Sequence, residues 1–223
     1  NKLMTCEKPV EANNLLSPEI DHRLMAMEPG THGVLIYDSA QNKQEVLFGH
    51  LAHGKADSKL VYVCSEERPA QIREEMDAYG LDVDGLVGRD RLTISNFEEV
   101  YIGKDDIVDI PRIIDGFAKA SWSCSKQGLG FRAAAEMSGF FRRGKAVELI
   151  EYERALGKKF YFPGMGVCAY NVVEMQSAGC LDILMPLLSA HGLVILTGPR
   201  GSVTMDSEQV RPRQVEKVLQ VQI

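Results

Sequence analysis

Polar and ionisable side chains gather at or just after the ends of short apolar runs in this sequence. They include carboxylates, phenols, amides and an arginine, which together can orient a polar ligand or move a proton. Any single one can equally be an ordinary helix cap or strand end, so the prediction of a ligand site rests on the whole group. Its members are Tyr37, Asp38, Ser39, Ser65, Glu66, Glu67, Asn96, Arg132, Tyr170, Asn171 and Thr197.

The segment 38–44 has the outline of a phosphate-binding loop without its glycines. Such a loop needs glycines so that backbone amides close around phosphate, followed by Lys-Ser or Lys-Thr for charge and magnesium. Here Lys43 supplies the charge, but Gln44 lacks the hydroxyl and Asp38 would repel a phosphate. These residues predict no ATP hydrolysis, and we assign no catalytic residue.

The histidines and cysteines form no strong metal-binding or nucleophile motif. His50 and His53 have i, i+3 spacing, but no further ligand follows them nearby. Cys168 lies in an apolar run, where cysteine acts as a small hydrophobe, and His191 is predicted in a loop. We therefore predict no metal site and no cofactor. Five cysteines without C-x-x-C spacing favour a reducing compartment, so we expect a cytoplasmic protein.

Two pairs of charged residues lie in the second half of the chain. Arg132 and Glu136 are four apart across a predicted strand-to-helix junction, where an acid in a cleft can bind a polar ligand or take a proton. Glu151 and Glu153 flank Tyr152 on a predicted helix, and residues two apart on a helix point in different directions. At most one of this second pair is therefore expected to face inward, and a solvated helix face is the alternative.

The composition is close to that of an average globular protein. The 223 residues are 45% hydrophobic and 25% charged, with a net charge of −6. This charge predicts no direct contact with nucleic acid. No apolar stretch reaches the roughly 18 residues of a membrane helix, and no secretory leader is visible, so we expect no membrane partner. Met4 is a candidate natural start.

Apolar runs alternate with helical patterns along the chain, and these elements must position the polar residues. Strands that are apolar throughout are covered on both faces, and strands that alternate with helices pair in parallel. We therefore predict a three-layer α/β sandwich with a mostly parallel central sheet over residues 30–205. An N-terminal arm, 1–29, contains at most one short helix near 18–27, and 206–223 is a charged tail. The predicted strands are 33–37, 60–64, 92–95, 128–132, 166–170 and 193–197, with a polar loop over 38–42 and helices over 133–141 and 145–156.

Several sequence blocks occur together in the order seen in a known family. They are Gly-Thr-His-Gly-Val-Leu-Ile-Tyr at 30–37, Leu-Val-Tyr-Val-Cys-Ser-Glu-Glu at 60–67, Gly-Phe-Arg-Ala-Ala-Ala-Glu-Met at 130–137, Glu-Tyr-Glu at 151–153, Cys-Ala-Tyr at 168–170, and His191. On these blocks the chain resembles, over residues 30–197, the MEDS domain, the sensory domain shared by methanogens, methylotrophs and the dichloromethane-responsive regulator DcmR. Val34 stands where that family often has cysteine, which argues against a sensing thiol at this position.

The resemblance implies a RecA/KaiC-like fold with a degenerate ATPase loop. It also implies a non-catalytic sensory domain that recognises small, hydrocarbon-derived molecules in signalling or transcriptional regulation. The partners to expect are the small-molecule ligand, a separate regulator or kinase, and further copies of the chain in a homo-oligomer. The expected ligand contacts are His32, Tyr37, Asp38, Lys43, Glu66, Glu67, Arg132, Glu136 and Tyr170.

Two alternative functions stay open at this point. Lys43, Glu66 and Glu67 occupy RecA-like positions, which supports a nucleotide-binding or residual ATPase domain. The second alternative is an assembly or adaptor domain whose strand ends bind nothing. On the sensory hypothesis, Arg132 anchors an anionic or carbonyl group and Tyr170 forms an aromatic wall.

Overall fold

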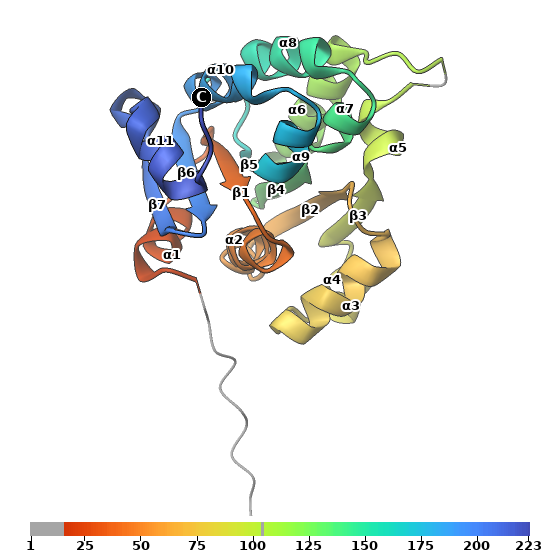
Figure 1. Cartoon of the computed structure of the whole chain (residues 1–223). Helices are drawn as coiled ribbons and strands as arrows, with labels where there is room; N and C mark the ends of the chain where they lie inside the picture. The colour runs from red at the N-terminus through yellow and green to blue at the C-terminus, as the bar shows by residue number, and fades with distance from the viewer. Residues whose placement is uncertain (1–15, 104) are drawn as a thin grey trace, which may run out of the picture.

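Within the described residues, 16–103 and 105–223, the computed structural model forms one seven-stranded sheet (Figure 1). The strand order is β3-β2-β4-β5-β1-β6-β7, and all neighbours pair in parallel except β6 and β7. The mostly parallel sheet predicted from the sequence is therefore confirmed. The strands are β1 (His32–Tyr37), β2 (Ser58–Cys64), β3 (Leu92–Asn96), β4 (Gly130–Glu136), β5 (Met165–Asn171), β6 (Leu193–Gly198) and β7 (Gly201–Asp206).

Helices cover both faces of the sheet, which gives the predicted three layers (Figure 1). One face, which we call the α2 face, carries α1 (Pro18–Met25), α2 (Ala40–Ala52), α3 (Pro69–Tyr79) and α4 (Val83–Gly88). The opposite face, the α8 face, carries α5 (Phe97–Tyr101), α6 (Ile110–Lys126), α7 (Gly139–Arg142), α8 (Ala146–Leu156), α9 (Val172–Ser177), α10 (Leu184–Ala190) and α11 (Pro212–Leu219). Two 3₁₀ turns, Leu181–Ile183 and Ser207–Gln209, complete the described elements.

Alternation along each strand divides the buried side chains between two cores. On β1, Val34 and Ile36 belong to the core of the α8 face, whereas Leu35 and Tyr37 belong to the core of the α2 face. All of β1 is buried because it lies between β5 and β6 with helices over both of its faces. Its first residue, His32, and its last, Tyr37, lie at opposite ends of the strand and therefore at opposite sides of the sheet along the strand direction.

The fourth strand is longer than the sequence predicted. A strand ending at residue 132 and a helix over 133–141 were expected, but β4 runs to Glu136 and α7 covers Gly139–Arg142 alone. Three consecutive alanines at 133–135 favour a helix locally. However, β4 pairs with β2 on one side and β5 on the other, and this pairing outweighs the local preference. Glu136 therefore ends a central strand.

The connection from β1 to α2 is shorter than the predicted loop over 38–42. Helix α2 begins at Ala40, and the hydroxyl of Ser39 caps it by accepting the backbone N–H of Asn42 at 3.3 Å. Asp38 and Ser39 are thus the whole connection. A phosphate-binding loop needs several more residues, with glycines, to turn its amides around a phosphate.

Both ends of the described chain pack onto the sheet. Ile20 and Leu24 of α1 are buried in the core of the α2 face, and Val215 and Leu219 of α11 are buried in that of the α8 face. Helix α1 confirms the short helix expected near 18–27. The candidate start Met4 lies outside the described residues. No helix in the described part of the chain is both long and apolar enough to cross a bilayer.

Candidate functional site

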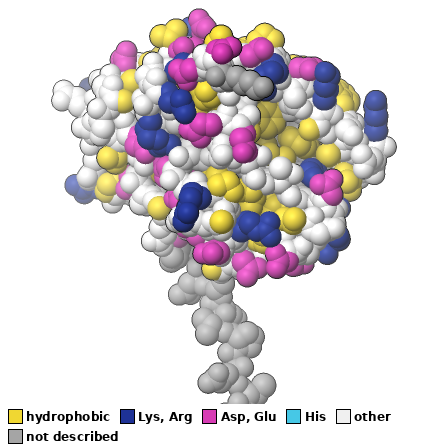
Figure 2. All heavy atoms as spheres, turned by 90° about the vertical axis from the view of Figure 1, so that its right-hand side faces the viewer, with side chains coloured by type: hydrophobic (Ala, Val, Ile, Leu, Met, Phe, Trp, Pro, Cys, Tyr) yellow, Lys and Arg dark blue, Asp and Glu magenta, His cyan; other side chains and the backbone are white. Residues whose placement is uncertain are grey.

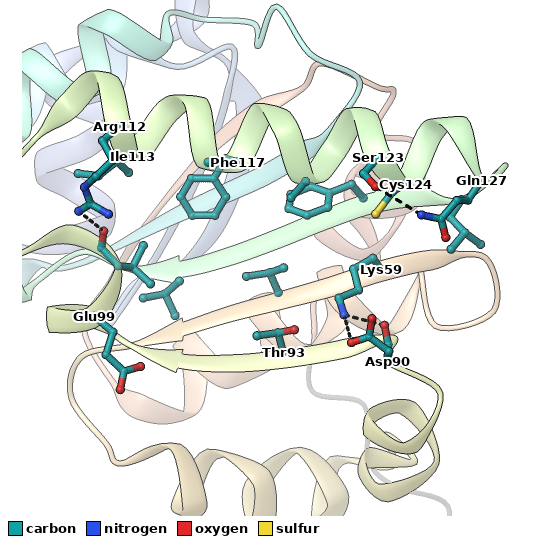
Figure 3. Close-up of a pocket in the computed structure, with 17 residues that line it drawn as sticks. Lys59, Asp90, Thr93, Glu99, Arg112, Ile113, Phe117, Ser123, Cys124 and Gln127 are labelled. Atoms are coloured by element: carbon teal, nitrogen blue, oxygen red, sulfur yellow. Dashed lines mark hydrogen bonds and ion pairs between the residues drawn. The ribbon is translucent and has the colours of Figure 1, made fainter.

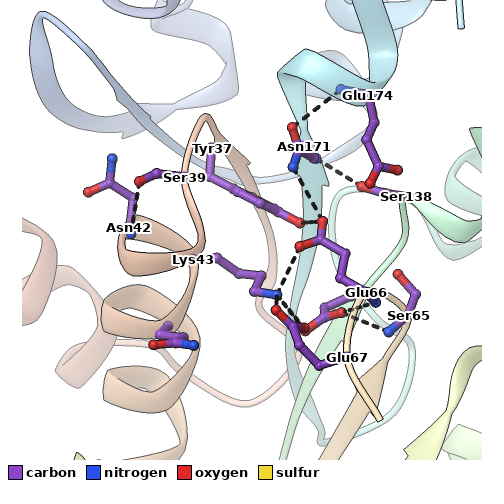
Figure 4. A network of polar contacts seen from close by, with 12 residues as sticks. Tyr37, Ser39, Asn42, Lys43, Ser65, Glu66, Glu67, Ser138, Asn171 and Glu174 are labelled. Carbon is purple, nitrogen blue, oxygen red and sulfur yellow. Dashed lines mark hydrogen bonds and ion pairs between the residues drawn. The ribbon is translucent and has the colours of Figure 1, made fainter. Parts of the chain in front are cut away.

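Lys43 lies in the first turn of α2 and meets three glutamates at the carboxyl edge of the sheet (Figure 4). Its Nζ lies 3.0 Å from Oε2 of Glu66 and 2.7 Å from Oε2 of Glu67. The third carboxylate, Oε1 of Glu136, lies 3.0 Å from the same Nζ. Lys43 and Glu136 are completely buried, whereas Glu66 and Glu67 are 16% and 13% exposed. We call these four residues and Tyr37 the strand-end cluster.

The three carboxylates lie together because they come from the carboxyl ends of two neighbouring strands. Glu66 and Glu67 follow β2, and Glu136 ends β4, which pairs with β2. The backbone N–H groups of Ser65 and Glu66 donate to Oε2 of Glu136 at 2.7 and 2.8 Å. The hydroxyl of Tyr62 donates to its Oε1 at 2.5 Å. Both oxygens of Glu136 are thus held by the protein itself.

The ends of β1 and β5 close the cluster from the other side. The Tyr37 hydroxyl donates a hydrogen bond to Oε1 of Glu66, and Nδ2 of Asn171 approaches the same oxygen at 3.4 Å. The side-chain oxygen of Asn171 also accepts the first N–H groups of α9, which fixes its orientation (Figure 4). Asp38 follows Tyr37 in the chain, and its Oδ1 accepts a hydrogen bond from Nδ2 of Asn42 at 2.7 Å.

The charges in the cluster stabilise one another and leave an anionic excess. Burial by itself would lower the pKa of Lys43, but Glu136 and Glu66 raise it above its ordinary value, so the ammonium stays charged. The pKa of Glu66 is lowered, because Lys43 and Tyr37 outweigh the opposing effect of burial. The pKa of Glu67 is raised by burial and then by the neighbouring Glu136 carboxylate. One ammonium faces three acids, so the cluster repels phosphate.

The sequence placed Arg132 at the carboxyl end of its strand, and this prediction was wrong. Arg132 lies near the start of β4, four residues and about 13 Å before Glu136. It is buried, and its Nη1 donates to the backbone oxygens of Leu24 and His50 at 3.3 Å each. Burial lowers its pKa. Arg132 therefore ties α1 and α2 to the sheet, away from the strand-end cluster.

His32 and Tyr170 also lie outside the strand-end cluster. His32 begins β1 and Tyr170 is on β5, and both side chains are buried on the α8 face, where they contact Glu153 of α8. Glu153 is buried and Glu151 is exposed, which confirms that one acid of this pair faces inward. His191 follows α10, as a loop residue would, but it is also buried beside Glu153.

An apolar groove lies on the α8 face between α6 and the exposed surface of β2 and β3 (Figures 2 and 3). Its volume is about 480 Å³. Val61, Val63 and Phe117 form part of the apolar wall, and polar groups such as Thr93 and Arg112 lie along its rim. Helix α6 covers β4 but leaves this part of the sheet open.

A family comparison identifies the chain. The model of the MEDS family, described as "MEthanogen/methylotroph, DcmR Sensory domain", matches residues 31–185, more than half of the chain. The chain belongs to the MEDS family. The sensory role is thus supported by the family description. No curated protein matches this MEDS domain significantly.

Solved structures share the fold of this MEDS domain. An uncharacterized protein from Pyrococcus horikoshii, crystallised with an unknown peptide, has a TM-score of 0.52 and 16% identity, covering 83% of this chain and 86% of that chain. A KaiC-like protein from the same archaeon has a TM-score of 0.53 and 13% identity, covering 82% of each chain. At these identities the likeness is one of fold, which is RecA/KaiC-like as expected.

Two features of the MEDS domain were not predicted from its sequence. The groove was missed because its apolar lining residues look the same in sequence as core residues. The second feature is the burial of His191 near His32. A signal for it exists in the sequence, since His32 and His191 both come just before apolar runs. Those runs form the adjacent parallel strands β1 and β6, whose starting ends lie side by side.

Proposed function

We propose that this MEDS domain is a non-catalytic sensor that binds a small, mainly apolar molecule in the groove between α6 and β2–β3. The observation that carries the proposal is the groove itself, which has a volume of about 480 Å³ and combines an apolar wall with polar and charged side chains. Binding sites for small organic molecules have this size and character. The family description supplies the sensory role, and an apolar groove suits the hydrocarbon-derived ligands that the resemblance implies.

The strand-end cluster supports a sensor more than a nucleotide-hydrolysing enzyme. Lys43 is buried and already neutralised by carboxylates, so its ammonium is not free to bind a phosphate. A ligand at the strand ends would have to separate this buried ion network, and breaking such a contact costs several kcal/mol. The groove needs no such rearrangement, which favours it over the predicted strand-end contacts as the ligand site.

Gly116 of α6 allows a direct test, because it lines the groove and a Cβ added there would meet no atom within 4 Å. Gly116→Leu therefore adds an apolar side chain to the groove wall with free space at its Cβ, and leucine is also the better helix residue. Gly88→Leu on α4, where a Cβ is equally free, is the matched control on the opposite face. The probe is anilinonaphthalene sulfonate, whose fluorescence rises in apolar sites. A panel of short alcohols and halogenated alkanes then competes for it.

We expect the wild type and Gly88→Leu to bind the probe with equal affinity. A member of the panel should displace it, and Gly116→Leu should bind it at least fivefold more weakly. Trp122, an exposed residue of α6 that precedes the groove-lining Ser123 in the chain, offers a second fluorescence readout. If Gly116→Leu binds the probe like the wild type, or no compound of the panel displaces it, the groove is not the sensing site.

A further inference from the structure

Four potential metal ligands converge on the α8 face, separate from both the groove and the strand-end cluster. His32 starts β1, Glu153 is on α8, Cys168 is in β5, and His191 follows α10. All four are buried, and one donor atom from each lies within 4.8 Å of every other. The residues come from distant parts of the sequence, so the fold itself has assembled them.

Both imidazoles are oriented by backbone carbonyl groups. Nδ1 of His32 lies 2.7 Å from the oxygen of Gly157, and Nδ1 of His191 lies 2.7 Å from that of Leu187. A carbonyl oxygen only accepts, so each Nδ1 carries a hydrogen and donates it. In a neutral ring the lone pair is then on Nε2. Histidines that bind metals are held in this way, with the second nitrogen donating to a carbonyl or carboxylate.

The two Nε2 atoms converge on one carboxylate oxygen. Each lies 3.3 Å from Oε2 of Glu153. Nε2 of His191 and Oε2 of Glu153 have no hydrogen-bond partner and are inaccessible to solvent. When both imidazoles are neutral, their Nε2 lone pairs face the negatively charged oxygen of Glu153, and all three groups repel one another. A cation between them, either a proton or a metal ion, removes this conflict.

Three of the six distances between the donor atoms match the edges of a tetrahedral zinc site, and all six are within 4.8 Å. Zinc–nitrogen and zinc–oxygen bonds of about 2.05 Å give tetrahedral edges of about 3.4 Å, and a zinc–sulfur bond of about 2.3 Å gives a nitrogen–sulfur edge of about 3.6 Å. The nitrogen–oxygen distances here are 3.3 Å. Sγ of Cys168 lies 3.6 Å from Nε2 of His32.

The surroundings complete the features of a closed metal site. The Tyr170 hydroxyl donates to Oε1 of Glu153 and leaves Oε2 directed at the histidines. The ring of Phe160 packs on His32 with 4.6 Å between centroids, which helps to exclude water. A carboxylate and a thiolate balance the charge of one divalent ion. Imidazole and thiolate ligands favour zinc over magnesium or calcium.

We propose that His32, Glu153, Cys168 and His191 bind one Zn²⁺ ion that links α8 and α10 to strands β1 and β5. With four protein ligands the site has no open position, so its role is structural. Within the described residues, a second group of potential metal ligands consists of Glu66, Glu67 and Glu136. The ammonium of Lys43 already lies among these carboxylates, so we do not propose a metal there. The zinc proposal departs from the sequence-based expectation of no metal and does not depend on the ligand proposed for the groove.

The test uses the full chain expressed in minimal medium supplemented with Zn²⁺ or Co²⁺, because a buried site must be loaded during folding. Metal content is measured by mass spectrometry after gel filtration. The cobalt form is examined by absorption spectroscopy for the intense visible bands of a tetrahedral ion and for a thiolate-to-cobalt charge-transfer band. Cys168→Ser and His191→Gln remove ligands, and Cys64→Ser, at a buried cysteine of β2, is the matched control.

We expect about one metal ion per chain in the wild type and in Cys64→Ser, with both spectral signatures in the cobalt form. Cys168→Ser and His191→Gln should lose at least tenfold in metal content, and Cys168→Ser should lose the charge-transfer band. A wild type with less than a tenth of an ion per chain would show that a proton occupies the cluster. Full metal content in either ligand variant, or a cobalt form without the thiolate band, would also overturn the proposal. The wild-type spectrum decides the question even if a variant does not fold.

Discussion

Replacing Lys43 by methionine removes the cation that three glutamates share at the carboxyl edge of the sheet. The ammonium is fully buried and lies 2.7–3.0 Å from each carboxylate, so its loss leaves like charges together with no compensation. Breaking a buried ion pair by removing one partner costs about 3–5 kcal/mol. We expect Lys43→Met to lower the free energy of unfolding at pH 7.5 by an amount in this range.

The pH dependence of this effect distinguishes it from a simple packing defect. In the wild type the raised pKa of Lys43 adds stability that is lost only in strong alkali, and the lowered pKa of Glu66 adds stability that is lost only as the pH falls below its ordinary value. In Lys43→Met, Glu67 loses the cation that opposes the rise of its pKa by burial and by Glu136. The folded state then takes up protons, so the variant should gain stability relative to the wild type as the pH falls from 8 to 5.

Urea unfolding followed by circular dichroism at several pH values measures this prediction. Lys59→Met is the control, because Lys59 pairs with the exposed Asp90 and such a pair contributes about 1 kcal/mol or less. Adding Glu67→Gln to Lys43→Met should recover part of the loss, since it removes one of the repelling charges. A loss equal to that of Lys59→Met, or one that does not change with pH, would show that the three glutamates do not depend on the charge of Lys43.

Two further predictions concern the scaffold around the sites. Arg132→Met should lower the free energy of unfolding by about 1–3 kcal/mol, because the carbonyl groups of Leu24 and His50 lose a buried donor. It should leave probe binding to the groove unchanged, and loss of binding without loss of stability would return Arg132 to the ligand site. Gly198→Ala should destabilise by about 1–3 kcal/mol, because the added Cβ would lie 2.3 Å from the backbone oxygen of Val218 in α11. Thermal unfolding beside Gly88→Ala, where a Cβ has free space, checks this, and equal stability of the two variants would contradict it.

The sequence predicted the class of fold and part of the strand-end cluster for clear physical reasons. The apolar runs that became β1 and β2 indicate buried parallel strands, and residues that follow parallel strands meet at one edge of the sheet. Tyr37 and Glu66 were therefore expected together, as observed. Glu136 lies in the same cluster although a helix was predicted over residues 133–141. Pairing with β2 and β5 extends β4 to this residue.

Two causes explain the misplaced residues: the end of the strand that a residue occupies and the face of the sheet on which its side chain lies. Tyr170 is near the carboxyl end of β5, but it is buried on the α8 face, opposite Tyr37. His32 and Arg132 lie at or near the beginning of their strands, so they occur at the edge opposite Tyr37 and Glu136. For Arg132 the error came from the limits of the strand, because the predicted strand ended at residue 132 whereas β4 continues to Glu136. The convergence of the four potential zinc ligands could not be predicted from the sequence, because it depends on the register between neighbouring strands. His32 pairs with Gly166, which places Cys168 two residues along β5 on the same face.

We propose that the segment from Asp38 to Gln44, which has the outline of a phosphate-binding loop, contributes Lys43 to a closed, anionic ion network and does not bind a nucleotide. The direct measurement is the melting temperature with millimolar Mg·ATP, together with an assay for released phosphate. A ligand at 100 times its Kd raises the free energy of unfolding by about 2.7 kcal/mol, which is easily detected. We predict no increase in melting temperature and no phosphate release. A clear increase that Lys43→Arg abolishes, with phosphate released by the wild type, would show that Lys43 belongs to a working nucleotide site.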